Sequence, residues 1–176
     1  MSWYEASEEP ETVEHGAVCG LAVTGRGEPG GGAYGESVGA LYAVLGALDA
    51  PMAPLEGRWW VEDERSPFDV PRDQWRWHLF IRLPDDIVSI GRARAEAGAG
   101  TPAAARVQHV SYNDGLCVQM LHRGAYADEP ASLARMDALM EAEGLVVNGL
   151  HHEIYLSDTR ETDPAKMRTI LRQPVR

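Results

Sequence analysis

LHHEIYLSD, residues 150–158, reads as a β-strand, and LEGRWWVED, residues 55–63, repeats its pattern in the first half of the chain. Both segments begin with leucine, carry aromatic and aliphatic residues in the middle and end in aspartate. Such short runs, bounded by turn-forming residues, are typical of strands. Aligning the two segments through Asp63 and Asp158 indicates an internal repeat.

The segments around this strand follow the same order in each half: strand, glycine-containing turn, helix, strand, strand. VCGLAVTGRGEP (18–29) resembles LCVQMLHRGAYADEP (116–130), and FIRLP (80–84) resembles ILRQP (170–174). We therefore predict an α+β fold of two duplicated strand–helix–strand–strand modules related by a pseudo-twofold axis. Its sheet would be antiparallel, with two main helices and a ligand cleft between the modules.

Composition sets the expected boundaries of this single domain, which covers residues 17–176. Module one spans 17–97, a linker containing Gly and Pro spans 98–103, and module two spans 104–176. Residues 1–16 are acidic and lack periodicity, so we expect a flexible tail there. No apolar run is as long as a membrane span.

The charge balance restricts the partners of the protein. The sequence has 16 basic and 27 acidic residues, for a formal net charge of −11. Phosphate binding needs a basic surface, so nucleic acid and anionic membranes are not expected partners. Hydrophobic, aromatic or cationic small molecules are compatible with this charge. Two free cysteines and no secretion signal favour a cytoplasmic location, and the oligomeric state does not follow from the sequence.

Two other motifs are weighed and set aside. GRGEPG (25–30) fits a GxGxxG pattern, but Pro29 lies inside it and later strands do not alternate with helices, so a plain turn is favoured over nucleotide binding. The histidines form no metal-binding motif, and His151 and His152 would point to opposite faces of a strand. We predict no metal site and no cofactor.

Large aromatic residues gather on two neighbouring predicted strands. Strand alternation puts Trp75 and Trp77 on one face, and Trp59 and Trp60 on opposite faces. The repeat alignment places Trp60 against Tyr155, so each half would present an aromatic ring to the groove. Core packing is the alternative, and it accounts for Trp59 and at least one other ring.

Glu153 lies on the same predicted face as Tyr155, two residues away. A partly buried carboxyl beside aromatic rings has a raised pKa and suits acid–base work, or it stays charged and pairs with a cationic ligand. The alternative is a structural carboxylate paired with Arg58, Arg82 or a histidine.

Longer segments resemble the GyrI-like small-molecule-binding family, and the resemblance covers nearly everything from about residue 17 to the end. The segments that carry it are PLEGRWW (54–60), DQWRWHLFIRLPD (73–85), GLCVQMLHRGAYADEP (115–130) and HHEIYLSDTRETDPAKMRTILRQPV (151–175). The resemblance implies SHS2-like modules with ligand held between them, and a glutamate matching Glu153 at the pocket floor. In many relatives this domain is the effector-binding part of a transcription regulator.

The RWW, WRW, DEP and HHEIYLSD motifs are similar to a stand-alone subfamily described as cyclopropanoid cyclopropyl hydrolases. This resemblance implies a hydrolase that opens the cyclopropane of DNA-alkylating drugs of the yatakemycin and CC-1065 type in an aromatic cage, giving self-protection or detoxification. By this resemblance the cage candidates are Tyr42, Trp60, Tyr155 and either Trp75 or Trp77, with Glu153 as their polar partner and with Tyr126 and Glu129 as second choices. We predict Glu153 and Tyr155 as the catalytic residues: Glu153 would orient the attacking water, and Tyr155 or a protonated carboxyl would donate to the carbonyl oxygen. The predicted ligand-binding residues are Tyr42, Trp60, Trp75, Trp77, Met120, His122, Tyr126 and Glu129.

Two non-catalytic alternatives remain open. The protein could be a multidrug-sequestering or gyrase-inhibitor-like module, or an effector subunit acting with a separate DNA-binding protein.

Overall fold

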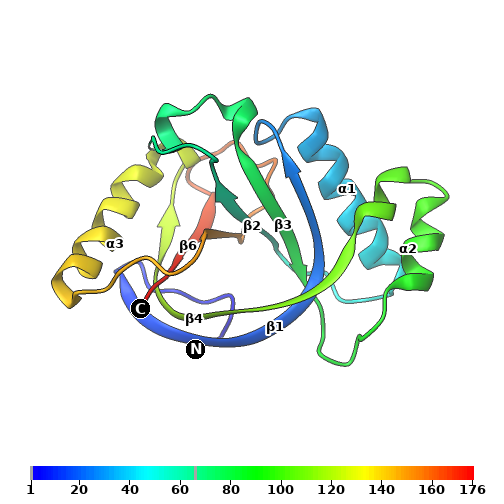
Figure 1. The fold of residues 1–176 in the computed structure, drawn as a ribbon, viewed down its shortest axis with the longest axis horizontal. Coiled ribbons are helices and arrows are strands. Elements are labelled where there is room, and N and C mark those ends of the chain that lie inside the picture. The colour runs from blue at the N-terminus through cyan, green and yellow to red at the C-terminus, as the bar shows by residue number, and fades with distance from the viewer. Residues whose placement is uncertain (1, 66) are drawn as a thin grey trace. The chain divides into compact units, whose positions relative to one another are not determined.

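The computed structural model describes residues 2–65 and 67–176 and has a mixed α+β architecture with an antiparallel sheet (Figure 1). The strands are β1 (Glu11–Arg26), β2 (Leu55–Trp60), β3 (Arg76–Arg82), β4 (Gln108–Arg123), β5 (His151–Tyr155) and β6 (Arg168–Pro174). The helices are α1 (Gly32–Ala47), α2 (Gly91–Gly98) and α3 (Glu129–Glu143). Short 3₁₀ turns are η1 (Pro67–Asp69), η2 (Arg72–Gln74), η3 (Pro102–Arg106) and η4 (Tyr126–Asp128).

The two main helices predicted from the sequence correspond to α1 and α3, and α2 is a shorter third helix. Within the described ranges, no helix has the length and apolar character needed to cross a membrane.

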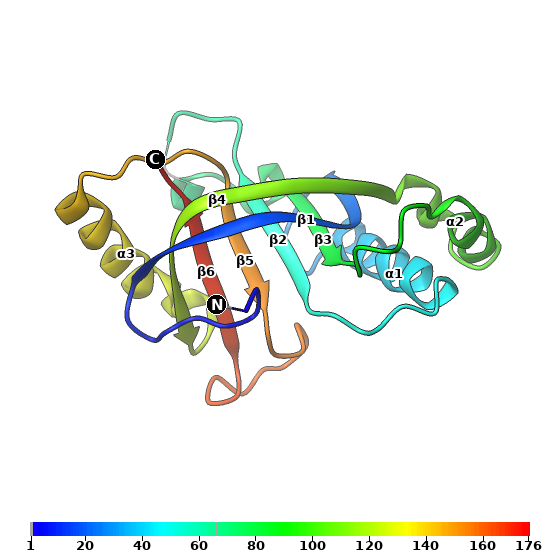
Figure 2. The same cartoon turned by 90° about the horizontal axis from the view of Figure 1, so that it is seen from below.

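By their internal contacts the residues group into two compact units. Unit one contains Met1–Ala17, Pro54–Glu56 and Asn113–Arg176, and unit two contains Val18–Ala53 and Gly57–Tyr112. The long strands β1 and β4, which lie side by side in Figure 2, each contribute residues to both units. The units are therefore not contiguous in sequence, unlike the two predicted modules, whose duplication stays a prediction.

Unit two has the strand order β1-β3-β2, and α1 packs against α2 and η3. β1 pairs antiparallel with β3, from Gly20 opposite Arg82 to Arg26 opposite Arg76. Gly25 is required by close packing, because a Cβ there would lie 2.0 Å from Cη2 of Trp77. The indole of Trp77 thus occupies the space that any larger residue would need.

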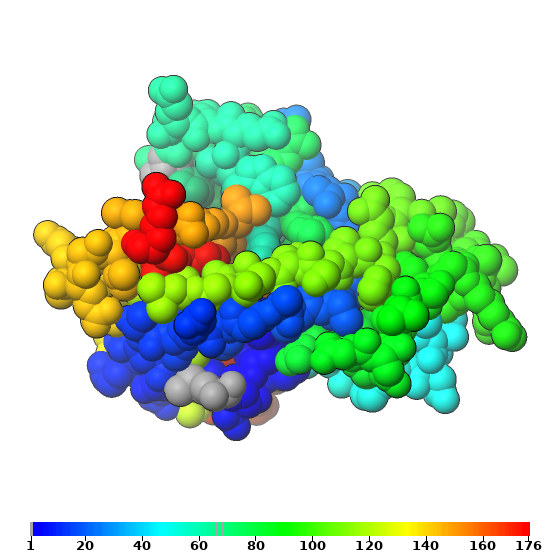
Figure 3. All heavy atoms as spheres, turned by 60° about the horizontal axis from the view of Figure 1, so that its bottom comes forward, coloured from blue at the N-terminus to red at the C-terminus, as the bar shows by residue number. Residues whose placement is uncertain are grey.

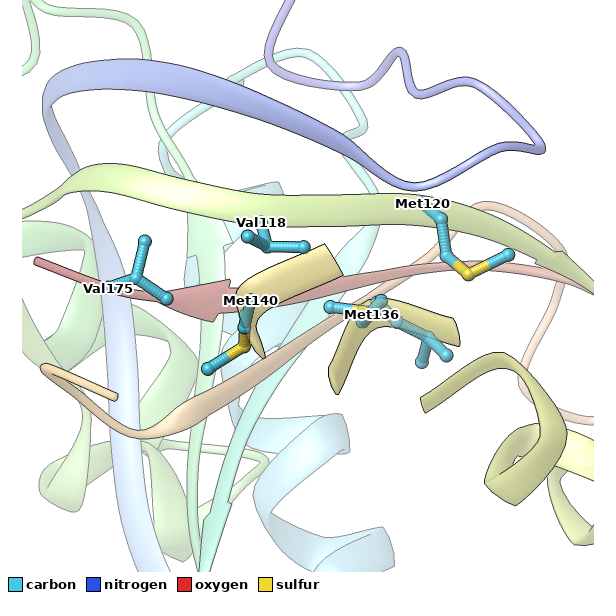
Figure 4. Packing of buried hydrophobic residues seen from close by; sticks show 6 residues of the cluster. Val118, Met120, Met136, Met140 and Val175 are labelled. Atoms are coloured by element: carbon cyan, nitrogen blue, oxygen red, sulfur yellow. The ribbon is translucent and has the colours of Figure 1, made fainter. Parts of the chain in front are cut away.

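Unit one has the strand order β5-β6-β4, with all neighbours antiparallel. α3 packs on this sheet through a cluster of buried residues (Figure 4). The cluster consists of Val118, Met120, Met136, Met140, Leu171 and Val175. α3 ends at Gly144, which adopts the left-handed conformation (φ 69°) that glycine tolerates best.

The N-terminal segment differs from the flexible tail expected over residues 1–16. β1 already begins at Glu11, and Trp3 is only 6 % exposed. The carbonyl of Ser7 accepts a hydrogen bond from the backbone N–H of Leu121, and Figure 3 shows the N-terminal residues in blue on the surface beside β4. The segment is held by single buried residues such as Trp3. Single buried residues produce no periodic pattern, so the sequence did not predict that the segment is ordered.

Candidate functional site

β5 in unit one carries the predicted catalytic residues. Its side chains alternate, so that His152 and Ile154 are fully buried on one face while Glu153 and Tyr155 share the other. The Tyr155 hydroxyl donates a hydrogen bond of 2.8 Å to Oε2 of Glu153. The expectation that these two side chains point the same way is confirmed.

Glu153 faces a second carboxyl, that of Glu129 at the start of α3. The Glu129 residue is 8 % exposed, and the Glu153 side chain is 15 % exposed. Burial first, and then the charge of Glu153, raise the pKa of Glu129 to about 9. Burial raises the pKa of Glu153 to about 7, against the opposing effects of the Tyr155 hydrogen bond and the charge of His152. Near neutral pH the pair therefore keeps at least one proton.

Glu129 also has an unused hydrogen-bonding atom. Its Oε1 is buried and has no hydrogen-bond partner among the described residues. An unpaired buried carboxyl oxygen is costly, because it has lost its water without gaining a replacement. Such an atom is suited to receive or give a hydrogen bond when a ligand binds.

Two tyrosines border the carboxyl pair. The rings of Tyr126 and Tyr155 meet edge to face, with centroids 5.9 Å apart. Burial and the charges of Glu153, Glu129 and Asp158, in that order, raise the pKa of Tyr126 to about 12. The Tyr126 hydroxyl therefore stays protonated at neutral pH and can donate a hydrogen bond.

His151 is a further neighbour of Glu153. It is not among the site residues predicted from the sequence. Its Nε2 lies 3.7 Å from Oε1 of Glu153. Burial and the charge of His152 lower the pKa of His151 to about 4, so its imidazole is neutral at pH 7. The available signal was the two-residue spacing from Glu153, which puts both side chains on one face of β5.

Unit two contains an aromatic cluster that includes part of the predicted cage. Tyr34 stacks on Trp59 at 6.0 Å with an interplanar angle of 18°, and meets Trp77 edge to face at 6.0 Å. Trp75 in turn meets Trp59 edge to face. Trp59, which was assigned to core packing, and Tyr34, which was not selected, thus join Trp75 and Trp77. Tyr34 follows a glycine-rich turn and has no periodic partner that would have drawn attention to it.

Two further predicted ligand-binding residues of unit two, Trp60 and Tyr42, lie outside this aromatic cluster. Trp60 is partly exposed at the end of β2, and the Tyr42 hydroxyl donates to the carbonyl oxygen of Ala53 at 3.5 Å. Arg58, considered above as an ion-pair partner, lies with its guanidinium carbon 3.5 Å from the centroid of the Tyr112 ring. This contact is a cation–π interaction.

Met120 and His122 have structural contacts on β4 in unit one. Met120 belongs to the cluster under α3 (Figure 4). His122 donates from Nε2 to the carbonyl oxygen of Ala125 at 3.1 Å, and its Nδ1 hydrogen-bonds Oγ of Ser132 at 2.9 Å. Both ring nitrogens are therefore engaged in holding the start of α3, and ligand contact by either residue stays a prediction.

Among the described residues, no group of three His, Cys, Asp or Glu side chains is placed to hold a metal ion. The groups gathered beside Glu153 in unit one, namely two carboxyls, two tyrosine hydroxyls and a neutral imidazole, can exchange protons with a ligand.

Buried acid–base groups in an α+β frame are features of proteins that bind or convert small molecules. The sequence profile of the GyrI-like small molecule binding domain matches residues 21–176. The chain therefore belongs to the GyrI-like small-molecule-binding family, as its motifs indicate. A search of curated proteins finds no match.

Three solved structures from Listeria innocua are similar over nearly the whole chain. One is an uncharacterized conserved protein with 36 % identity and a TM-score of 0.89. The other two are described as hydrolases, with 34 % and 33 % identity and TM-scores of 0.87 and 0.85. Each comparison covers 99 % of this chain and 95 % of the other.

Proposed function

We propose that this protein is a hydrolase that opens the cyclopropane ring of DNA-alkylating cyclopropanoid drugs and so detoxifies them. The observation that carries the proposal is the coupled carboxyl pair of Glu129 and Glu153, with Tyr155 hydrogen-bonded to Glu153. Such a pair supplies an acid and a base at the same pH. The similarity to two Listeria hydrolases supports the enzyme class, and the sequence resemblance supports the substrate class.

The reaction needs one proton acceptor and one proton donor. In these drugs the cyclopropane is conjugated to a dienone, so attack by water on the ring CH₂ breaks a C–C bond and sends that electron pair to the carbonyl oxygen. The single product carries a new alcohol on the former ring CH₂ and a phenol in place of the dienone, with no leaving group and no oxidant or reductant required. Glu153 as a carboxylate takes the proton from the attacking water, since its pKa of about 7 leaves much of it ionised at neutral pH.

The acid is assigned to Glu129, whose pKa of about 9 keeps it protonated at neutral pH. It donates a proton to the oxygen on which negative charge develops, and its unpaired Oε1 is a free hydrogen-bonding position for that contact. The Tyr126 hydroxyl is a second donor. A proton then returns from Glu153 to Glu129 to complete the cycle.

The test uses purified protein, a yatakemycin-type drug and water enriched in ¹⁸O. We expect ring-opened product carrying one ¹⁸O, in an amount exceeding one molecule per protein, as measured by mass spectrometry. The variant Glu141→Gln changes an exposed glutamate of α3 and serves as the control that keeps wild-type turnover. Tight binding without product above the protein-free reaction would contradict the hydrolase proposal.

Sequestration is the second candidate, and the same carboxyl pair favours it for cationic drugs. A pair that retains a proton can release it and present a buried negative charge to a bound cation. Protection that saturates at one drug per protein, with the drug recovered intact, would identify this function.

A further inference from the structure

A second group of buried charges lies behind β5, on the face opposite Glu153. The group, here called the buried charge cluster, consists of Glu56, Asp114, His152 and Arg172, whose side chains are at most 5 % exposed. His152 Nε2 lies 2.9 Å from Oε2 of Glu56, and His152 Nδ1 lies 2.9 Å from Oδ2 of Asp114. Arg172 Nη1 lies 3.9 Å from the same Asp114 oxygen.

The hydrogen bonds of the cluster restrict where its protons can lie. Ionised carboxylates only accept hydrogen bonds, so with Glu56 and Asp114 ionised both ring nitrogens of His152 must donate. His152 is then an imidazolium, and the two positive and two negative charges of the cluster balance.

The N-terminal segment adds hydrogen bonds to the cluster. Trp3 Nε1 and the Tyr4 hydroxyl donate to Oε1 of Glu56 at 3.0 Å and 3.3 Å. Arg172 donates from Nη2 to the Trp3 carbonyl at 3.0 Å, and its guanidinium carbon lies 4.4 Å from the Trp3 ring centroid. The residues that enclose His152 therefore come from the N-terminal segment, β2, β4 and β6.

Stability alone does not account for this cluster. Burying ion pairs has a large desolvation cost, and well-packed apolar residues in their place are often as stabilising. What the cluster adds is a fixed positive charge on the residue adjacent to Glu153 in β5. Because the two side chains point to opposite faces of β5, the charge acts on Glu153 across the strand backbone, through the protein interior rather than through bulk water.

We propose that His152 is a positioning residue for the carboxyl pair: its imidazolium, fixed between Glu56 and Asp114, anchors β5 and favours the carboxylate form of Glu153. The proposal rests on the base role given to Glu153 under the proposed function. His152 does not touch the reacting atoms and acts only through Glu153.

The effects of the surrounding charges on Glu153 have the expected direction. The charge of His152 lowers the pKa of Glu153, against the larger effect of burial, and also lowers the pKa of His151. Glu56 and Asp114 oppose the effect on Glu153, because their negative charges disfavour a further carboxylate. Other titratable or charged groups near the cluster or the carboxyl pair are His15 on β1, Arg172 on β6, Glu129 on α3, Tyr126 on η4 and Asp158, together with His151 and Tyr155 on β5 itself.

Two variants of the full chain with opposite charge effects test the proposal. His152→Gln removes a positive charge and Glu56→Gln removes a negative one, and glutamine keeps one hydrogen bond in each case. The side-chain carboxyl ¹³C signal of Glu153, assigned by its loss in Glu153→Gln, is followed against pH by NMR. We expect the midpoint to rise by about half a pH unit or more in His152→Gln and to fall in Glu56→Gln.

Disturbed packing would not move the two midpoints in opposite directions. An unmoved midpoint in His152→Gln, or movement of both in the same direction, overturns the proposal. The NMR titration requires no drug, so a failure of the hydrolase proposal is recognised separately by the absence of product. In measurements of turnover against pH, the rate should fall on the acid side with a midpoint that shifts in each variant as the Glu153 midpoint does.

Discussion

At the residue scale, burial gives ordinary carboxyls their unusual protonation. Glu129 and Glu153 come from α3 and β5, far apart in sequence, and each raises the cost of ionising its neighbour. Their pKa values of about 9 and 7 differ enough for one to act as acid and the other as base. The same property makes the pair a source of instability at alkaline pH.

The first prediction concerns this instability. A carboxyl whose folded pKa is raised binds more protons in the folded than in the unfolded state, so the free energy of unfolding falls as pH rises between the two pKa values. For Glu129 that window runs from 4.5 to about 9. His151 has the opposite effect between about 4 and 6.5, because its folded pKa is lowered. Measurements between pH 6.5 and 8.5 therefore isolate the carboxyls.

We expect the wild-type free energy of unfolding to fall by about 1 kcal/mol per pH unit over that range. Glu129→Gln should flatten the dependence and be more stable than wild type at pH 8, in urea titrations. An equal slope in both proteins would show that Glu129 ionises normally.

At the scale of single elements, the N-terminal segment contributes to the stability of unit one. Trp3 is buried against the Arg172 guanidinium and donates to Glu56, although its sequence surroundings are acidic and aperiodic. We predict that Trp3→Ala lowers the free energy of unfolding by about 3 kcal/mol, since it removes a large buried ring and a partner of a buried carboxylate. Tyr4→Phe removes only a 3.3 Å hydrogen bond and should cost about 1 kcal/mol. Equal, negligible losses in urea titrations would mean that the segment is loosely attached.

The packing of β1 on β3 gives another prediction at this scale. Gly25→Ala forces a Cβ to 2.0 Å from the Trp77 ring, so we expect a loss of about 2 kcal/mol. Gly39→Ala is the matched control, because a Cβ there meets nothing within 4 Å and alanine favours the helix α1. Thermal unfolding should show a lower Tm for the first variant and an equal or higher Tm for the second. A neutral Gly25→Ala would contradict the packing of Trp77 described above.

The turns after the two aligned strands also bear on the repeat. Asp63 Oδ1 accepts from the backbone N and Nε of Arg65 at 2.8 Å and 2.9 Å. Asp158 Oδ1 accepts from the same atoms of Arg160 at 2.9 Å and 3.0 Å. This local likeness supports the alignment of the two segments, and the duplication of whole modules stays a prediction.

At the scale of the whole molecule, the family and the α+β class can be predicted from the sequence, because they depend on long motifs that follow one another in a fixed order. Individual side-chain contacts cannot be predicted in this way. The pairing of Tyr155 with Glu153 follows from strand alternation alone. Glu129 was only a second choice, since its importance depends on the first turn of α3 meeting β5, which no local pattern encodes. The burial of Trp3 was missed for the same reason, because the residues that hold it are distant in sequence.

The central claim is that Glu153 is the base of a ring-opening reaction, and the rate of drug opening by Glu153→Gln tests it most directly. Glutamine keeps the size and polarity of the side chain but cannot take a proton from water. We expect kcat to fall by about 100-fold or more while the Kd for the drug changes by less than about 10-fold, with Glu141→Gln unchanged in both. Full turnover by Glu153→Gln would contradict the account and leave Glu153 with a structural role.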